Sequence, residues 1–114
     1  MKLGDILKRL DTGDEVTIAT AAAEYHGTVI DHGYTESKKD PVDPWYDPGG
    51  ATALIQLNDA TVERLGLSVN TLRVSCGQFD DYPAWKTPVV ALYQDGEEQE
   101  ELGDVTDIQP VAES

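Results

Sequence analysis

The sequence predicts a mainly β protein, a small closed barrel of five or six strands with a short N-terminal helix and one further helical turn. Three observations support this fold class. The first ten residues carry aliphatic side chains at helical spacing. Several later segments alternate apolar and polar residues, as strands with one buried face do. The chain has only 114 residues, and closing such short strands into a barrel leaves no sheet edge exposed.

The two helical segments are predicted from apolar spacing and capping residues. The first covers residues 1–10, because four aliphatic residues share one helical face: Leu3, Ile6, Leu7 and Leu10. The second is a single turn over 60–65. Asn58 or Asp59 can cap its start and Gly66 can end it.

Five strands follow from alternation, and a sixth is indicated around Val105 and Ile108. The five predicted strands cover residues 16–19, 25–30, 52–57, 71–76 and 88–93. The acids at positions 97, 98, 100 and 101 are interpreted as a solvated face or a hairpin tip. We expect one domain over residues 1–114, as the length suggests.

Two segments interrupt the alternation and are rich in aromatic residues. Residues 33–50 contain three Asp-Pro pairs, which disfavour helix and predict a long loop of a length that is often functional. A second loop is predicted over 79–86. Aromatic side chains on loops can anchor a partner, or they can fold back and fill the open end of a small barrel. The candidate partner-binding residues are Tyr34, Trp45, Tyr46, Tyr82 and Trp85.

The chain is strongly acidic, with 22 Asp plus Glu against 8 Lys plus Arg and a formal charge of −14. This composition resembles that of cytoplasmic proteins from extreme halophiles, especially haloarchaea. The resemblance implies a cytoplasmic location in a salt-rich cell. No apolar run approaches the length of a membrane span, and the first residues do not form a secretory signal. The single cysteine excludes an internal disulfide.

Residues 13–18 and 24–31 resemble the first two strands of Sm-like and SH3-like small barrels. The resemblance implies an N-terminal helix followed by a strongly bent five-stranded sheet, with Gly27 at the bend. It fails at the residues that bind RNA. Tyr34 and Thr35 stand where Sm proteins place an asparagine, and Arg73 is followed by Val74 instead of glycine. The resemblance therefore supports the architecture and not the RNA pocket.

A metal site or a catalytic centre would depend on His26, His32 and Cys76. The two histidines share a face if their strand is unbroken. The chain lacks the tightly spaced ligand pairs of zinc sites, and Cys76 shares its strand face with apolar residues, so we interpret it as a small buried side chain. Ser75 or Cys76 could pair with a histidine as a nucleophile, but no known catalytic motif surrounds them. We expect no catalytic residue, bound metal or cofactor.

The sequence therefore predicts a non-enzymatic binding or adaptor domain whose partner, a protein, contacts the aromatic loops. The main alternative is an Sm-like barrel that binds nucleic acid through Lys38, Lys39, Arg73 and stacked tyrosines. The negative charge disfavours this alternative, because phosphate contacts require Lys and Arg. A small metal-binding protein or enzyme is a third hypothesis. Self-association of the chain is left open.

Overall fold

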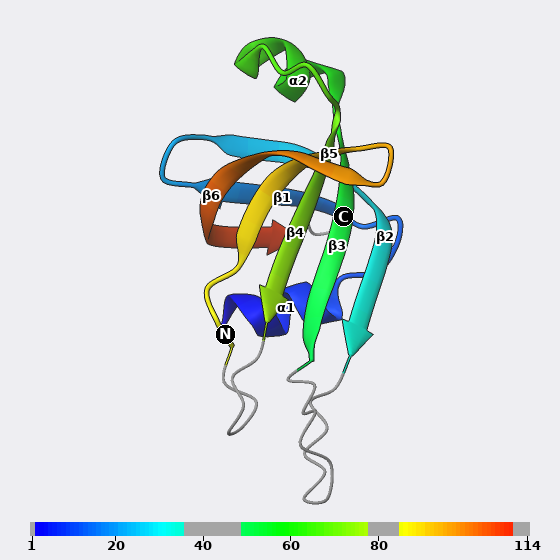
Figure 1. The fold of residues 1–114 in the computed structure, drawn as a ribbon, viewed down its shortest axis with the longest axis vertical. Helices are drawn as coiled ribbons and strands as arrows, with labels where there is room; N and C mark the ends of the chain where they lie inside the picture. The colour runs from blue at the N-terminus through cyan, green and yellow to red at the C-terminus, as the bar shows by residue number, and fades with distance from the viewer. Residues whose placement is uncertain (1, 36–48, 78–84, 111–114) are drawn as a thin grey trace, which may run out of the picture.

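A computed structural model describes residues 2–35, 49–77 and 85–110 as a closed barrel of six strands with two short helices (Figure 1). Each strand pairs antiparallel with the next, and the last strand pairs with the first. The mainly β barrel, the N-terminal helix, the helical turn and the sixth strand are thus confirmed. In order, the elements are α1 (Leu3–Arg9), β1 (Glu15–Thr20), β2 (Glu24–Thr35), β3 (Gly50–Leu57), α2 (Asp59–Leu65), β4 (Thr71–Gly77), β5 (Val89–Gln94) and β6 (Glu97–Pro110).

The two helices lie at opposite ends of the barrel, with α1 across one end and α2 projecting beyond the other (Figure 1). The capping residues of α2 behave as predicted. The Asn58 side chain accepts a hydrogen bond of 2.8 Å from the Thr61 backbone N–H, and Gly66 adopts the left-handed conformation that ends the helix. Of the two candidate caps, Asn58 is therefore the one used. No helix in the described parts of the chain is long and apolar enough to cross a membrane.

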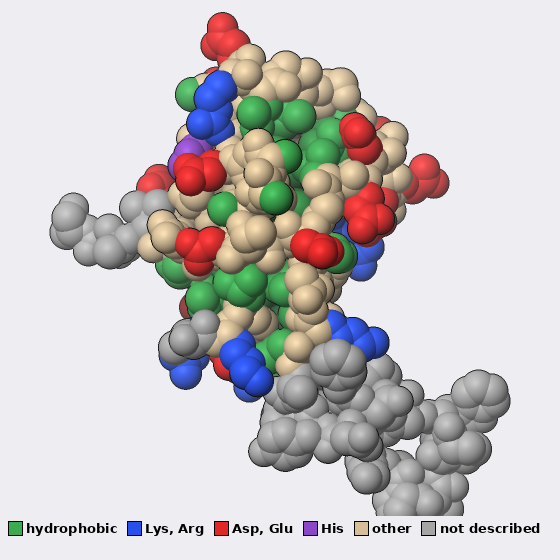
Figure 2. Space-filling model, turned by 90° about the vertical axis from the view of Figure 1, so that its left-hand side faces the viewer, with side chains coloured by type: hydrophobic (Ala, Val, Ile, Leu, Met, Phe, Trp, Pro, Cys, Tyr) green, Lys and Arg blue, Asp and Glu red, His purple; other side chains and the backbone are tan. Residues whose placement is uncertain are grey.

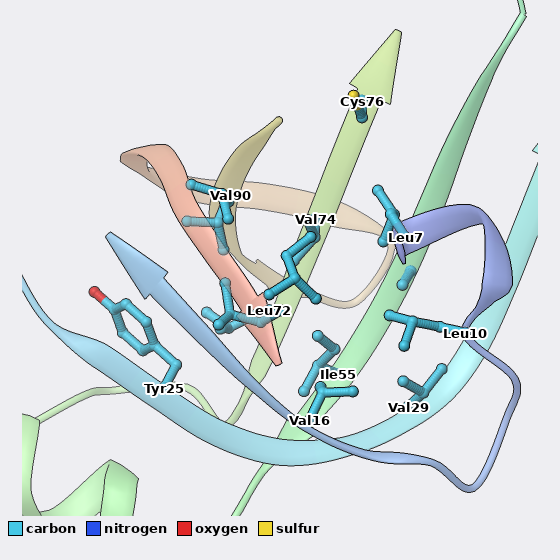
Figure 3. Packing of buried hydrophobic residues seen from close by; sticks show 14 of the residues in the cluster. Leu7, Leu10, Val16, Tyr25, Val29, Ile55, Leu72, Val74, Cys76 and Val90 are labelled. Carbon is cyan, nitrogen blue, oxygen red and sulfur yellow. The ribbon is translucent and has the colours of Figure 1, made fainter. Parts of the chain in front are cut away.

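The hydrophobic core fills the barrel and extends to α1 (Figure 3). Alternate residues of the strands point inward, as the sequence pattern predicts, and Leu7 of α1 and Leu10 directly after it join them at one end. Cys76 is 2% exposed, which confirms its interpretation as a small buried side chain. The remaining core side chains include Val16, Ile18, Tyr25, Val29, Ile55, Leu57, Leu72, Val74, Val90, Leu92, Val105 and Ile108.

The prediction of a loop over 33–50 is wrong at both ends. Strand β2 continues through Gly33, Tyr34 and Thr35, which pair with Thr52, Ala51 and Gly50 of β3. The sequence of β2 contains no proline, so every residue of this extension can take part in the ladder. Residues 36–48, which hold the three Asp-Pro pairs, lie outside the described residues.

The sixth strand is longer than predicted, because it begins at Glu97, directly after the turn that follows β5. Asp95 and Gly96 both have positive φ angles, of 54° and 82°, which suits a tight two-residue hairpin. The acids of this segment are exposed on a paired strand, in agreement with the solvated face proposed from the sequence. Apolar alternation begins only after this acidic stretch, so the pattern located the second half of β6 alone.

Candidate binding surfaces

Two of the predicted partner-binding residues, Tyr34 and Trp85, meet on α1. Their ring centroids lie 6.3 Å apart with the planes inclined by 51°. The indole N–H of Trp85 donates a hydrogen bond of 2.9 Å to the Asp5 carboxylate, and the Lys8 ammonium lies 4.5 Å from the centroid of the Tyr34 ring. Both rings are half-buried and pack against the core. They therefore close one end of the barrel and still present part of their surface to solvent.

Glycine at position 4 makes the approach of Trp85 to α1 feasible. A Cβ atom at Gly4 would lie only 2.0 Å from Cδ2 of the indole ring. The ring thus occupies the space that any other residue's side chain would need at this position.

The remaining predicted aromatic residues Trp45, Tyr46 and Tyr82, together with Lys38 and Lys39, lie outside the described residues. The chain leaves the described structure after Thr35 and Gly77, at the end of the barrel that carries α1 (Figure 1). Sequence reasoning placed Tyr34 and Trp85 on separate loops. The structure instead brings them together from the end of β2 and from the segment before β5.

Positive charge is concentrated at the same end. Acidic side chains are spread over the barrel wall, whereas most Lys and Arg side chains in view lie beside α1 (Figure 2). The exposed basic residues of the described chain at this end are Lys2, Lys8, Arg9 and Lys86. We call these four residues, together with Tyr34 and Trp85, the α1 surface.

The two other basic residues of the described chain lie away from the α1 surface. Arg73 is in β4, four residues before Gly77, on the outer face of the barrel. Its guanidinium lies 3.3 Å from the carboxylate of Glu98 in β6. Arg64 in α2 donates to the backbone carbonyl of Glu24. Arg73 thus neutralises an acid on the barrel wall.

His26 and His32 do not share a face, contrary to the prediction for an unbroken strand. Val29 pairs with Ile55 and Asp31 with Leu54, so a β-bulge at Ile30 reverses the alternation between the two histidines. His32 pairs with the buried Ala53 and faces inward, and its Nε2–H donates a hydrogen bond of 2.7 Å to the Leu7 carbonyl. His26 pairs with Thr17 on the outer face.

The three residues of the metal and nucleophile hypotheses therefore have separate partners. The thiol of Cys76 donates to the Lys86 carbonyl at 2.9 Å, and burial raises its pKa from the usual 9.0 to about 11. A thiol with this pKa is a weak nucleophile at neutral pH. Among the residues that the structure describes, no group of three or more His, Cys, Asp or Glu side chains is positioned to hold a metal ion.

A hydroxyl, an imidazole and a carboxylate line up on the outer face at Thr17, His26 and Glu24. The Thr17 hydroxyl lies 2.8 Å from Nδ1 of His26, but the Glu24 carboxylate is 3.9 Å from Nε2. That second distance exceeds a hydrogen bond, so the carboxylate does not fix the imidazole as a catalytic base requires. This cross-strand contact was not foreseen from the sequence, and it links β1 to β2.

A second surface was also not foreseen from the sequence. A groove of about 590 Å³ lies on the outer face of the barrel, between the β2 bulge and the β5–β6 hairpin. We call it the outer groove; its lining residues are Ile30, Leu54, Ser68, Val69, Asn70, Thr71, Tyr93, Gln94 and Asp95. Ile30 is 43% exposed.

Comparisons with protein-family models, with curated proteins and with solved structures found no match for this chain.

Proposed function

We propose that this chain is a non-enzymatic binding or adaptor domain, and that a protein partner contacts the α1 surface. The observation that carries the proposal is the meeting of Tyr34, Trp85 and Lys8 on α1, at the end where basic side chains gather. Tyrosine and tryptophan are among the residue types enriched at protein interfaces and at their energetic hot spots. Acidic side chains are spread over the barrel wall in view, so carboxylates of a partner fit best against the cations at this end (Figure 2).

The composition supports placing this domain in the cytoplasm of an extreme halophile. At about 1 M salt the Debye length is about 3 Å, so only charges in contact still attract each other. A partner in such a cell would be held mainly by the apolar area of the two rings. The nearby cations would then set the orientation of the bound partner through the carboxylates that touch them directly.

Nucleic acid remains the alternative partner, and the contacts of Arg73 weigh against it. Of the three basic residues expected to contact phosphate, Arg73 is in an ion pair with Glu98 on the barrel wall. A formal charge of −14 also repels a polyanion wherever the surface is acidic.

The proposal is tested by affinity capture from a halophile lysate in about 2 M potassium chloride, followed by binding measurements with the purified captured protein. The variant Lys8→Glu reverses a charge at the α1 surface, and Arg73→Glu is the matched control on the barrel wall. We expect a captured protein whose affinity falls about tenfold or more with Lys8→Glu and little with Arg73→Glu.

Two results would overturn the proposal. Equal loss of affinity in both variants would show that general charge and not the α1 surface holds the partner. Capture of nuclease-sensitive RNA or DNA, with binding that weakens steeply as salt rises, would support the nucleic-acid alternative instead.

A further inference from the structure

We propose that the outer groove binds a peptide segment of a partner protein that carries an aliphatic side chain next to lysine or arginine. This site is distinct from the α1 surface and does not depend on it. The argument begins with the β-bulge of β2. Because Ile30 and Asp31 together oppose Leu54 of β3, the bulge turns both side chains to the outer face of the barrel. An aliphatic group and a carboxylate therefore lie beside each other on the surface.

The groove continues from this bulge across three further strands and the connection that precedes β4. Leu54, Val69 and Tyr93 add apolar surface beside Ile30. Ser68, Asn70, Thr71 and Gln94 add polar groups able to hydrogen-bond a peptide backbone. A volume of about 590 Å³ falls within the range of natural ligand sites, which runs from about 300 to 1,000 Å³.

The charge around the groove selects the partner. Asp31 adjoins Leu54 and Asp95 lines the opposite side, and both are exposed. Arg73, whose neighbours across the strands are Leu54 and Ala91, is in an ion pair with Glu98. The remaining carboxylates at the rim therefore favour a cationic segment and repel phosphate and acidic peptides.

The closed barrel determines how such a segment can bind. Strand β3, which contributes Leu54 to the floor of the groove, pairs with both β2 and β4, so a peptide cannot be added beside it as a further strand. On this floor the segment binds through its side chains, with an aliphatic group on the apolar surface and a neighbouring ammonium or guanidinium group at Asp31 or Asp95. This combination is the chemistry that the groove recognises.

The test uses two synthetic ten-residue peptides, one of alternating lysine and leucine and one of alternating lysine and serine. They carry equal charge, so a difference in affinity reports the aliphatic contact. Binding to ¹⁵N-labelled full-length protein is followed by NMR at low and at molar potassium chloride. We expect the leucine peptide alone to bind at molar salt, with the largest shifts at Ile30, Leu54 and Tyr93.

Three variants locate the site. Ile30→Ser removes the exposed aliphatic group and should weaken the leucine peptide about tenfold. Asp95→Asn removes the charge and keeps a residue that tolerates the positive φ at this position. It should weaken binding of the leucine peptide about threefold, and only at low salt. Asp104→Asn, an exposed change on β6, is the matched charge control and should have no effect.

Equal affinity of the two peptides, or equal binding by wild type and Ile30→Ser, would overturn the proposal. It would also be overturned if light scattering showed a dimer that Ile30→Ser converts to monomer, because a second copy would then occupy the groove. The shift pattern of each folded variant, recorded without peptide, ensures that lost binding is not lost folding.

Discussion

The contact between Gly4 and Trp85 predicts that replacing this glycine with alanine destabilises the protein. Elsewhere in a helix the same change is favourable by up to about 1 kcal/mol, because alanine has the higher helix propensity. Here the new Cβ would lie 2.0, 2.2 and 2.5 Å from Cδ2, Cγ and Cε3 of the indole ring. Distances of this kind are far inside van der Waals contact, so the ring has to move away from α1.

The magnitude follows from what Trp85 loses when it moves. Displacement breaks the hydrogen bond from its indole N–H to Asp5, which contributes about 1 kcal/mol. It also removes packing against the core. Truncating a fully buried tryptophan costs about 3–5 kcal/mol, and for this half-buried ring we take about 2 kcal/mol. After the gain in helix propensity, Gly4→Ala should lower the free energy of unfolding by about 2 kcal/mol.

The assay is urea denaturation of four proteins in the same potassium chloride concentration: wild type, Gly4→Ala, Trp85→Ala and the double variant. In the Trp85→Ala background the clash is absent, so Gly4→Ala should there be neutral or stabilising. The double-mutant cycle should give a coupling energy of about 3 kcal/mol. Gly33→Ala is the matched control, because a Cβ at that position meets no atom within 4 Å.

A neutral or stabilising effect of Gly4→Ala in the wild-type background would refute the packing of Trp85 on α1. The half-buried rings of the α1 surface would then not be held in place as described. If Gly4→Ala changed the free energy of unfolding equally in wild type and in Trp85→Ala, the loss of stability would not come from a clash with the indole ring.

Three other measurements follow from the structure. Asn58→Ala removes the side-chain cap of α2 and should lower the free energy of unfolding by about 1 kcal/mol in urea denaturation; an unchanged midpoint would contradict the capping role. Burial raises the pKa of the Cys76 thiol from 9.0 to about 11, so the unfolded chain releases this proton at a lower pH than the folded protein. The contribution of the buried thiol to the free energy of unfolding is therefore complete below pH 9 and is lost as the pH rises toward 11. In Cys76→Ala the denaturation midpoint should therefore fall less between pH 9 and pH 11 than in wild type. The same pH profile in both proteins would refute the role of the thiol. With 22 acids in the chain, the melting temperature should be higher in about 2 M than in about 0.05 M potassium chloride, since screening relieves self-repulsion in the folded state; a level or lower value would show that self-repulsion does not control the fold.

The elements that could be predicted from sequence are those whose pattern is local. The leucine spacing of α1, the capping residues of α2 and the alternation of the central strands each depend on residues within one segment. The predicted ends of the strands were less accurate. Tyr34 belongs to β2 because it pairs with Ala51 of β3, and the acidic start of β6 has no apolar alternation by which a strand could be recognised. Pairing between segments supplies the missing information, and a single sequence does not display it.

The candidate surfaces depend even more on contacts between distant residues. Trp85 and Asp5 are 80 positions apart in the chain, so their hydrogen bond has no local signal. The bulge at Ile30 was equally hidden, since it is defined only by the register of β2 against β3. That one extra residue placed His26 and His32 on opposite faces and put Asp31 beside Ile30 on the outer face. Tyr34 and Trp85 could be singled out from the sequence as candidates, but neither surface could be assembled from it.

Salt should affect the stability of this protein and its binding in different ways. The fold carries many like charges at distances that only low salt leaves unscreened, so molar salt should stabilise it. Both candidate surfaces instead combine apolar area with charges placed to touch a bound partner directly: the two rings with Lys8 at the α1 surface, and Ile30 with Asp31 beside the outer groove. Apolar burial persists at molar salt, and contact distances are comparable with the remaining Debye length. A partner of either surface should therefore stay bound as salt rises and the fold is stabilised, whereas a partner held by long-range charge alone should dissociate.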